Sequence, residues 1–427
     1  MRNIEWKHSD SLNEKYCIIK NTGRPDIYYC PKDMTNICAM VVVKYGSTDI
    51  TEKEPAGIAH FLEHKMFTAE DGGDAFDLFA DLGADANAYT SFDRTVYFFN
   101  CTQNFPAAFT ELLRMLNNPY FTEETVQKEQ GIIAQEIGMY DDEPDYYCWQ
   151  NLISALYQNH PVKLNICGTV ESIKQISPAL LYDAYEKYYD SSNCAIVVCG
   201  NVDIDELCDL VENNTVLKSH KIEALDAVKE PDYPIKSRVV AYRNVSLPIF
   251  NIGFKDRIPS SDPVERIKRH IALSILMRML FASSGDLYNE LYDSQIITST
   301  ITYNHDFGKD YSFVTLGGMS KIPERACEKI NEYLNKVKKN GLNKDDFERS
   351  RRVLIADFIS RFDSTEDIAN AIAVNTIDEI SVFEEFDLIR EIKFEDVEVV
   401  LQEVFNSEYK AVSFVLPIDN SYKKGVK

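Results

Sequence analysis

Three residues in one short segment have the types and spacing of a hydrolytic zinc site: His60, Glu63 and His64, in the pattern H-x-x-E-H. Residues three and four apart on a helix share a face, so both imidazoles and the carboxylate would point the same way. Neutral imidazoles suit Zn²⁺, which in catalytic sites keeps one position open for water. Glu63 would stand beside that water and take its proton. The alternative interpretation is two surface histidines and a solvated glutamate on an amphipathic helix.

Two histidines leave a zinc ion short of a protein ligand, so a third donor is expected elsewhere in the chain. A long predicted helix over residues 122–140 offers Glu129 and Glu136, which are seven residues apart and therefore lie on one face. From spacing alone either carboxylate is a candidate ligand, and either could instead be solvated or salt-bridged.

The elements that must position these residues occur in the same order twice. In the first half we predict a strand at 38–45, the His-Glu-His helix, a β-rich stretch at 87–100, and helices at 106–117 and 122–140. In the second half we predict a strand at 248–254, a helix at 267–280, a β-rich stretch at 296–318, and helices at 323–339 and 343–362. A duplicated α+β unit is the simplest account of this order.

The two predicted halves are separated by a linker and differ in their chemistry. Residues 1–215 form the zinc-binding half, 216–238 a charged, proline-containing linker, and 239–427 a homologous half without metal. Aligning the two helices by their apolar ends sets Ser274, Met277 and Arg278 against His60, Glu63 and His64. Packing therefore accounts for the helix in both halves, and some other requirement accounts for the His-Glu-His set.

Composition limits the class of protein. The chain has 427 residues, is 45% hydrophobic and carries a formal charge of −23, which argues against nucleic-acid binding. Its 10 cysteines show no C-x-x-C pair and are interpreted as buried free thiols. No window approaches the roughly 18 uncharged apolar residues that would span a bilayer. The first residues lack the apolar run of a secretory signal, so we expect a cytoplasmic protein with no membrane partner.

The inverted zinc motif, followed by the helix that carries Glu129 and Glu136, resembles the pitrilysin, insulin-degrading enzyme and mitochondrial processing peptidase family. Shorter pieces of the resemblance are at residues 86–91, 168–173 and 197–203. The resemblance implies two homologous α+β halves, each an antiparallel sheet flanked by helices, that together form a half-clamshell. It also implies a zinc-dependent metallopeptidase that cleaves unfolded peptides.

The resemblance further implies a role for each candidate residue. His60, His64 and Glu136 would bind one zinc ion, and Glu63 would activate water. Glu129 would be a supporting carboxylate that orients a ligand, or the replacement ligand if the predicted helix register is wrong. A substrate would add as a strand to an open sheet edge at Asn87 and Ala88, with Asn87 bonding its backbone. The alternative for Asn87 is a turn residue that closes residues 83–86.

The chain departs from the family in its second half. Self-sufficient members similar to this chain carry an arginine and a tyrosine there, and here Tyr292 and Ser299 stand at those positions. Loss of an oxyanion donor typically costs on the order of 10²–10³ in rate. We therefore predict the zinc-carrying subunit of a heterodimer, whose sister subunit supplies the Arg/Tyr pair, with leader peptides of modified peptides among its substrates. The alternatives are a self-sufficient homodimeric peptidase and a non-catalytic scaffold subunit.

Overall fold

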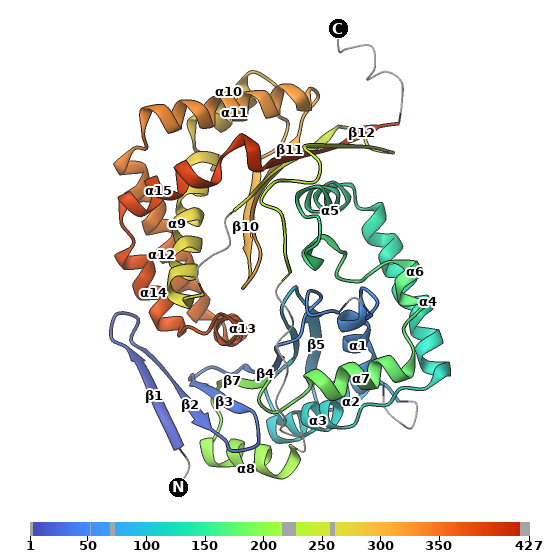
Figure 1. Ribbon diagram of the computed structural model, residues 1–427. Helices are drawn as coiled ribbons and strands as arrows, with labels where there is room; N and C mark the ends of the chain where they lie inside the picture. Colours follow the sequence, from blue (N-terminus) through green and yellow to red (C-terminus); the bar gives the residue numbers. More distant parts are fainter. Residues whose placement is uncertain (1–2, 52, 69–72, 216–227, 257–260, 419–427) are drawn as a thin grey trace. The chain divides into compact units, whose positions relative to one another are not determined.

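The computed structural model describes residues 3–51, 53–68, 73–215, 228–256 and 261–418. The chain divides into two compact units. Unit 1 comprises Met1–Ile137, Asn165–Asp226 and Asp357–Phe386, and unit 2 comprises Gly138–Leu164, Ala227–Ala356 and Asp387–Lys427. Each unit holds one β-sheet flanked by helices, which confirms the predicted α+β class (Figure 1).

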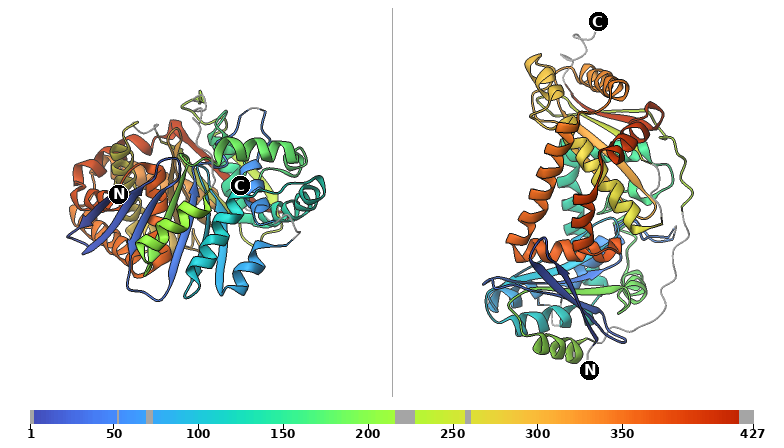
Figure 2. Two further views of the ribbon diagram at one scale, coloured as in Figure 1. Left: turned by 90° about the horizontal axis from the view of Figure 1, so that it is seen from below. Right: turned by 90° about the vertical axis from the view of Figure 1, so that its left-hand side faces the viewer.

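Unit 1 contains a seven-stranded sheet, part of which Figure 2 shows from below. Its strands, in spatial order, are β1 (Asn3–Ser9), β2 (Glu14–Lys20), β3 (Asp26–Pro31), β7 (Cys194–Gly200), β4 (Ile37–Val43), β6 (Thr95–Cys101) and β5 (Ala84–Thr90). The central strands β4 and β7 are almost wholly apolar and buried, as expected for strands covered on both faces. Strand β5 forms one edge of the sheet and β1 the other.

The helices of unit 1 cover both faces of this sheet. They are α1 (Ile58–Met66), α2 (Ala75–Asp81), α3 (Phe105–Asn117), most of α4 (Glu123–Asp142), α6 (Val170–Ile173), α7 (Pro178–Tyr188), α8 (Ile204–Asn214) and α13 (Thr365–Asp378). Successive residues of a strand point to opposite faces. In β4, Ala39 and Val41 join the core shared with α1 and α3. Met40 and Val42 are equally buried on the other face, and α13 packs against β4 and β7.

Unit 2 contains a five-stranded sheet. Its strands, in spatial order, are β10 (Thr302–Phe307), β11 (Ser312–Met319), β9 (Ile249–Lys255), β12 (Lys410–Pro417) and β8 (Arg238–Arg243). Its helices are α5 (Pro144–Leu156), α9 (Pro263–Phe281), α10 (Asp286–Asp293), α11 (Pro323–Asn340), α15 (Phe394–Val404) and most of α12 (Lys344–Ser360), and α14 (Val382–Glu391) is shared with unit 1.

The two sheets repeat the same strand order. The run β3-β7-β4-β6-β5 in unit 1 corresponds to β8-β12-β9-β11-β10 in unit 2. Helix α1 lies between β4 and β5 in the chain, and α9 lies between β9 and β10. One pair in each sheet departs from the predicted antiparallel arrangement: β3 runs parallel to β7, and β8 runs parallel to β12. These pairs join the first and last strands of each repeat, and the chain between them is long enough for a parallel crossover.

The units exchange corresponding helices. Helix α5 follows the first repeat's α4 but packs on β12, β9 and β8 of unit 2, whereas α13 follows the second repeat's α12 but packs on β7, β4 and β3 of unit 1. The contacts therefore group the chain differently from the predicted ranges 1–215 and 239–427. Of the predicted linker, residues 216–227 lie outside the described residues. Its remainder belongs to unit 2, where Arg238 begins β8.

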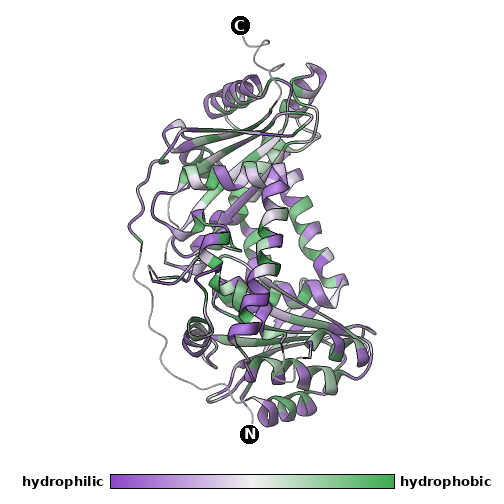
Figure 3. Ribbon diagram, turned by 90° about the vertical axis from the view of Figure 1, so that its right-hand side faces the viewer, coloured by the Kyte–Doolittle hydropathy of each residue, from purple (hydrophilic) through white to green (hydrophobic). Residues whose placement is uncertain are grey.

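Helix α9 qualifies the expectation that no segment could span a membrane. By length and composition alone, the segment Pro263–Asp293, which contains α9 and α10, is long and apolar enough to do so, and 50% of its most apolar window is buried inside the structure. Helix α9 packs against α15 and β10, as a core helix does. Hydrophilic and hydrophobic residues alternate along many helix ribbons in Figure 3, which is the pattern of helices with one buried face.

Candidate metal centre

Helix α1 holds the His-Glu-His set in the buried part of unit 1. Phe61 and Leu62 are fully buried in the core, and His60 and Glu63 are only 7% and 8% exposed. The imidazole rings of His60 and His64 lie 4.6 Å apart between centroids. The interpretation of these residues as a solvated surface set was therefore wrong, because His60 and Glu63 are buried beside core residues.

Helix α4 brings the predicted carboxylates to this set. Val126, Ile133 and Ile137 are its buried residues, so they define the stripe that packs on the core. Glu129 and Glu136 each come three residues after one member of this stripe and border it. The predicted register of the helix therefore agrees with the structure.

The donor atoms of the predicted ligands converge. Glu136 Oε1 lies 3.6 Å from His60 Nε2, and Glu136 Oε2 lies 3.5 Å from His64 Nε2. Donor atoms about 2.0–2.3 Å from a tetrahedral zinc ion lie roughly 3.3–3.8 Å from one another. Both distances are within that range, so Glu136 is at a spacing from each histidine that a shared zinc ion allows.

Glu129 contacts His64 through the other ring nitrogen. Its Oε1 lies 3.1 Å from His64 Nδ1. Burial lowers the pKa of His64, but the hydrogen bond to Glu129 and the charges of Glu63, Glu129 and Glu136 outweigh burial and raise that pKa. The same negative surroundings favour a bound cation. His60 differs, because its Nδ1 is buried and has no hydrogen-bond partner among the described residues.

Cys167 also lies at this centre, which the sequence did not indicate. Its Sγ is 3.7 Å from His60 Nε2 and 3.9 Å from Glu136 Oε1. Among the described residues, His60, Glu136 and Cys167 form a group whose donor atoms lie within 4.8 Å of one another. Burial, and then the charges of Glu136 and Glu63, raise the pKa of the Cys167 thiol far above its ordinary value.

Two glycines account for the position of Cys167. Gly57 precedes α1 with φ 89°, and a Cβ there would lie 2.5 Å from the carbonyl oxygen of Cys167. Gly168 has φ 76°, and a Cβ there would collide with the backbone of Ala56. Only glycine permits this close approach of the two backbones, which brings the residue before Gly168 beside the start of α1.

Glu63 projects from the same helix toward strand β5. Thr90, the last residue of β5, donates a hydrogen bond from its Oγ1 to Glu63 Oε2 at 2.7 Å. Thr90 was not among the predicted site residues, although it belongs to the segment 86–91 that resembles the family. Its neighbours in the sequence show nothing that distinguishes it from an ordinary strand threonine.

The predicted substrate-binding residues lie on an edge strand. Strand β5 pairs with β6 and ends the sheet on that side. Asn87 and Ala88 lie inside β5, so the alternative of Asn87 as a turn residue was wrong. The Asn87 side chain accepts a hydrogen bond from the backbone N–H of Ala88 at 2.8 Å.

The residues at the family's Arg/Tyr positions lie in unit 2. Tyr292 is on α10 and is 51% exposed. Ser299 follows α10 in the chain, and its Oγ accepts the backbone N–H of Met319 at 3.1 Å. Neither side chain offers a cationic hydrogen-bond donor of the kind an arginine supplies.

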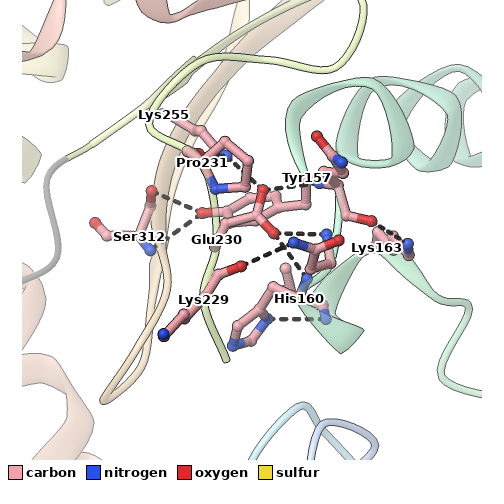
Figure 4. A network of polar contacts seen from close by, with 11 residues as sticks. Tyr157, His160, Lys163, Lys229, Glu230, Pro231, Lys255 and Ser312 are labelled. Atoms are coloured by element: carbon pink, nitrogen blue, oxygen red, sulfur yellow. Dashed lines mark hydrogen bonds and ion pairs between the residues drawn. The ribbon is translucent and has the colours of Figure 1, made fainter. Parts of the chain in front are cut away.

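A second buried polar cluster lies in unit 2, and Figure 4 shows most of it. The carboxylate of Glu230 accepts backbone N–H groups from Gln158, Asn159 and His160 at 2.6–2.8 Å. It also pairs with Lys255 Nζ at 2.6 Å, and both side chains are 6% exposed. Burial raises the pKa of Glu230, but these hydrogen bonds outweigh it and hold the pKa below its ordinary value.

The same cluster borders a cavity of about 420 Å³. Arg269, on its wall, binds Asp256 with two nitrogens and Glu403 with a third. Ser312 donates a hydrogen bond to Asp256 at 3.0 Å. Both cations of this wall, Lys255 and Arg269, are bound by carboxylates of unit 2.

Comparison with known proteins agrees with the geometry of unit 1. Residues 31–170 match the family model "Insulinase (Peptidase family M16)", and residues 175–354 match "Peptidase M16 inactive domain". Zinc protease YmfH of Bacillus subtilis (strain 168) is 34% identical over 421 residues, which cover 96% of this chain and 98% of that protein. The beta subunit of the human mitochondrial-processing peptidase is 31% identical over 36% of this chain and 33% of its own length.

Solved structures agree as well. An M16-like peptidase from Alicyclobacillus acidocaldarius superposes with a TM-score of 0.90 at 28% identity, covering 96% of this chain and 100% of that chain. Pitrilysin superposes with a TM-score of 0.75 at 16% identity over 96% of this chain and 46% of its own, which concerns the fold alone. The match to YmfH over nearly the whole of both proteins shows the family: the chain belongs to the insulinase family of metallopeptidases, peptidase family M16.

Proposed function

We propose that this chain is a zinc endopeptidase that hydrolyses unfolded peptides, with His60, His64 and Glu136 as metal ligands and Glu63 as the general base. The observation that carries the proposal is the position of Glu136, whose two carboxylate oxygens face Nε2 of His60 and Nε2 of His64 at 3.6 and 3.5 Å. Glu63 lies on the same helix as both histidines. Relatives that span nearly the whole chain and are named zinc proteases support the proposal.

The chain's own residues account for the proton transfers. A zinc ion, when bound, supplies a Lewis acid that polarises the scissile carbonyl and acidifies water. Glu63 accepts the proton of the attacking water, and the water oxygen bonds to the carbonyl carbon. The carbon–nitrogen bond then breaks as Glu63 returns the proton to the leaving amine. Glu129 keeps Nε2 of His64 directed at the donor cluster by holding Nδ1.

The free edge of β5 supports an extended peptide as substrate. An edge strand presents unpaired N–H and C=O groups, which an unfolded chain can satisfy by adding as a further strand. We propose that the backbone of Asn87 and Ala88 receives the substrate in this way. The side chain of Asn87 would exchange its present bond with the N–H of Ala88 for one with the substrate backbone. Leader segments of modified peptides, which are unfolded, are one substrate class of this kind.

We further propose that a sister subunit completes the active site. Tyr292 and Ser299 occupy the positions where the resemblance expects an arginine and a tyrosine. Removal of one hydrogen-bond donor to the oxyanion typically lowers the catalytic rate by a factor on the order of 10²–10³. A sister subunit that carries the Arg/Tyr pair would restore this factor. A homodimer that uses other donors is the second candidate, and a scaffold subunit without activity is the third.

Hydrolysis of a quenched library of unstructured peptides by the zinc-loaded chain tests the proposal, with Glu63→Gln as the control. We expect one zinc per chain in both proteins. We expect cleavage only without the substitution, weak for the single chain and at least about 10²-fold faster with the sister subunit. Full activity of Glu63→Gln would refute the assigned base. Strong cleavage by the single chain would favour the homodimer, and zinc binding without cleavage in either preparation would favour the scaffold.

A further inference from the structure

The hydroxyl of Thr90 is a hydrogen-bond partner of Glu63 that the proposed mechanism leaves without a role. The Oγ1 of Thr90 lies 2.7 Å from Glu63 Oε2. Glu63 is 8% exposed, so little water is available to replace this bond. An ionised carboxylate only accepts hydrogen bonds, and the proton of the bond must therefore come from Thr90.

Thr95, which lies beside Thr90 on the adjacent strand, uses its hydroxyl differently. Thr90 and Thr95 are directly opposite each other in the β5–β6 ladder, and their hydroxyl oxygens are 3.4 Å apart. Thr95 is fully buried and donates to the carbonyl oxygen of Tyr45 at 2.9 Å. Each hydroxyl has one proton. The Thr95 proton satisfies the backbone, and the Thr90 proton remains for Glu63.

The backbone holds Thr90 firmly. It is the last residue of β5, and Thr95 is the first residue of β6. The N–H of Ser91 donates to the carbonyl oxygen of Arg94 at 2.8 Å and closes the connection between the strands. A β-branched side chain in a strand has few χ1 rotamers, so the hydroxyl has a restricted direction.

We propose that Thr90 is a positioning residue that selects which oxygen of Glu63 acts as the base, an inference that rests on the proposed function. Its hydrogen bond occupies Oε2 and leaves Oε1 to take the proton of the attacking water. When the O–H bond of water breaks and the proton moves to Oε1, Oε2 becomes the carbonyl oxygen of a carboxylic acid. It still accepts the Thr90 proton, so the same bond persists until the proton passes to the leaving amine.

Two valine substitutions at the same cross-strand pair test this inference, because valine keeps the shape of threonine and removes only the hydroxyl. We expect Thr90→Val to lower kcat on the order of 10- to 100-fold, as expected for loss of a hydrogen bond to a charged group, with KM changed by less than about threefold. Thr95→Val should leave kcat within about threefold. It should lower Tm more than Thr90→Val does, because it leaves the buried Tyr45 carbonyl unpaired.

A serine variant distinguishes positioning from a structural role. Thr90→Ser keeps the hydroxyl with a freer χ1 and should recover most of the lost kcat. Zinc content should be one per chain throughout, and circular dichroism should show a folded chain.

Each contrary outcome has a distinct meaning. An active Thr90→Val, or a Thr90→Ser as slow as Thr90→Val, would overturn the inference while the proposed function stands. A rise in KM alone would assign Thr90 to substrate binding and would also overturn it. An unmodified chain that binds zinc but cleaves nothing, with and without the sister subunit, would remove the proposed function and this inference together.

Discussion

The two units share a strand order and differ in how they use buried charge. In unit 2, Glu230 is bound by Lys255 and three backbone N–H groups, and Arg269 is bound by Asp256 and Glu403. In unit 1, the carboxylates of Glu63, Glu129 and Glu136 surround two imidazoles that are neutral unless protonated. In the first arrangement each cation is bound by carboxylates of the protein. In the second, three carboxylates surround imidazoles, which favours a bound cation.

This difference shows why a buried polar cluster is not by itself a functional site. The cluster of unit 2 is as deeply buried and borders a cavity, yet its hydrogen bonds join the segment after α5 to the segment before β8. That is a structural role. The corresponding helices support the same distinction, because α1 carries His60, Glu63 and His64, whereas α9 carries Ser274, Met277 and Arg278 in the aligned positions.

The largest expected effect is on metal binding in unit 1. Glu136→Gln removes the carboxylate whose two oxygens face both Nε2 atoms. We expect zinc affinity to fall by more than the roughly 10–100-fold typical for loss of a group that only supports a ligand. Competition with a chromogenic chelator measures this affinity. Unchanged affinity would show that the carboxylate of Glu136 is not a ligand and that the two units do not differ in the way described above.

The second prediction concerns unit 2. Lys255→Met leaves the buried carboxylate of Glu230 without its cation, and breaking a buried pair costs about 3–5 kcal/mol. We expect the urea midpoint to fall, while zinc affinity and kcat at 25 °C stay unchanged. Arg325→Met, which removes an exposed pair with Glu328, is the matched control and should leave the midpoint nearly unchanged. Loss of zinc in folded Lys255→Met would contradict the structural role of this cluster.

Much of this comparison was predictable from the sequence, because it depends on local periodicity. The apolar run at 38–45 became β4 (Ile37–Val43), and the helix predicted at 122–140 became α4 (Glu123–Asp142). The spacing of Glu129 and Glu136 was sufficient to predict that both face the histidines. The duplicated order of elements was likewise visible, since each half has its own strand–helix–strand pattern.

The remainder depends on contacts between distant segments. Cys167 reaches the metal centre because Gly57 and Gly168 let two loops approach, and no local pattern reports such a contact. The exchange of α5 and α13 between units likewise consists of contacts between segments far apart in the sequence. Thr90 looks like any strand threonine until β5 and α1 are brought together. Sequence periodicity predicts which face of a helix or strand is buried, but it does not predict which other element packs against that face.

The third prediction distinguishes the metal ligand Glu136 from Glu129, the carboxylate that supports a ligand. Glu129→Gln keeps a side chain of the same size beside His64 Nδ1 but removes the charge. We expect zinc affinity to fall by roughly 10–100-fold, less than for Glu136→Gln, because Glu129 acts on the metal through His64. The same competition assay measures both variants. If Glu129→Gln had the larger effect, Glu129 would be the ligand and Glu136 the supporting carboxylate.

The smallest effect is expected at Cys167, the donor that sequence reasoning missed. Two alternative sets of three ligands are conceivable at this centre. Both contain His60 and Glu136, and the third ligand is His64 in one set and Cys167 in the other. Burial raises the pKa of the thiol above its ordinary value, which disfavours the thiolate that zinc binding requires. The supporting contact from Glu129, in contrast, already orients His64. We therefore expect Cys167→Ser to change zinc affinity by less than the roughly tenfold lower bound for a supporting group.

Replacing zinc with cobalt allows absorption spectroscopy to test whether Cys167 is a metal ligand. A cobalt-loaded chain with His60, His64 and Glu136 as ligands should lack the intense near-ultraviolet charge-transfer band of a cobalt–thiolate bond, and Cys167→Ser should leave its spectrum unchanged. A band that disappears in Cys167→Ser would make the thiol a ligand.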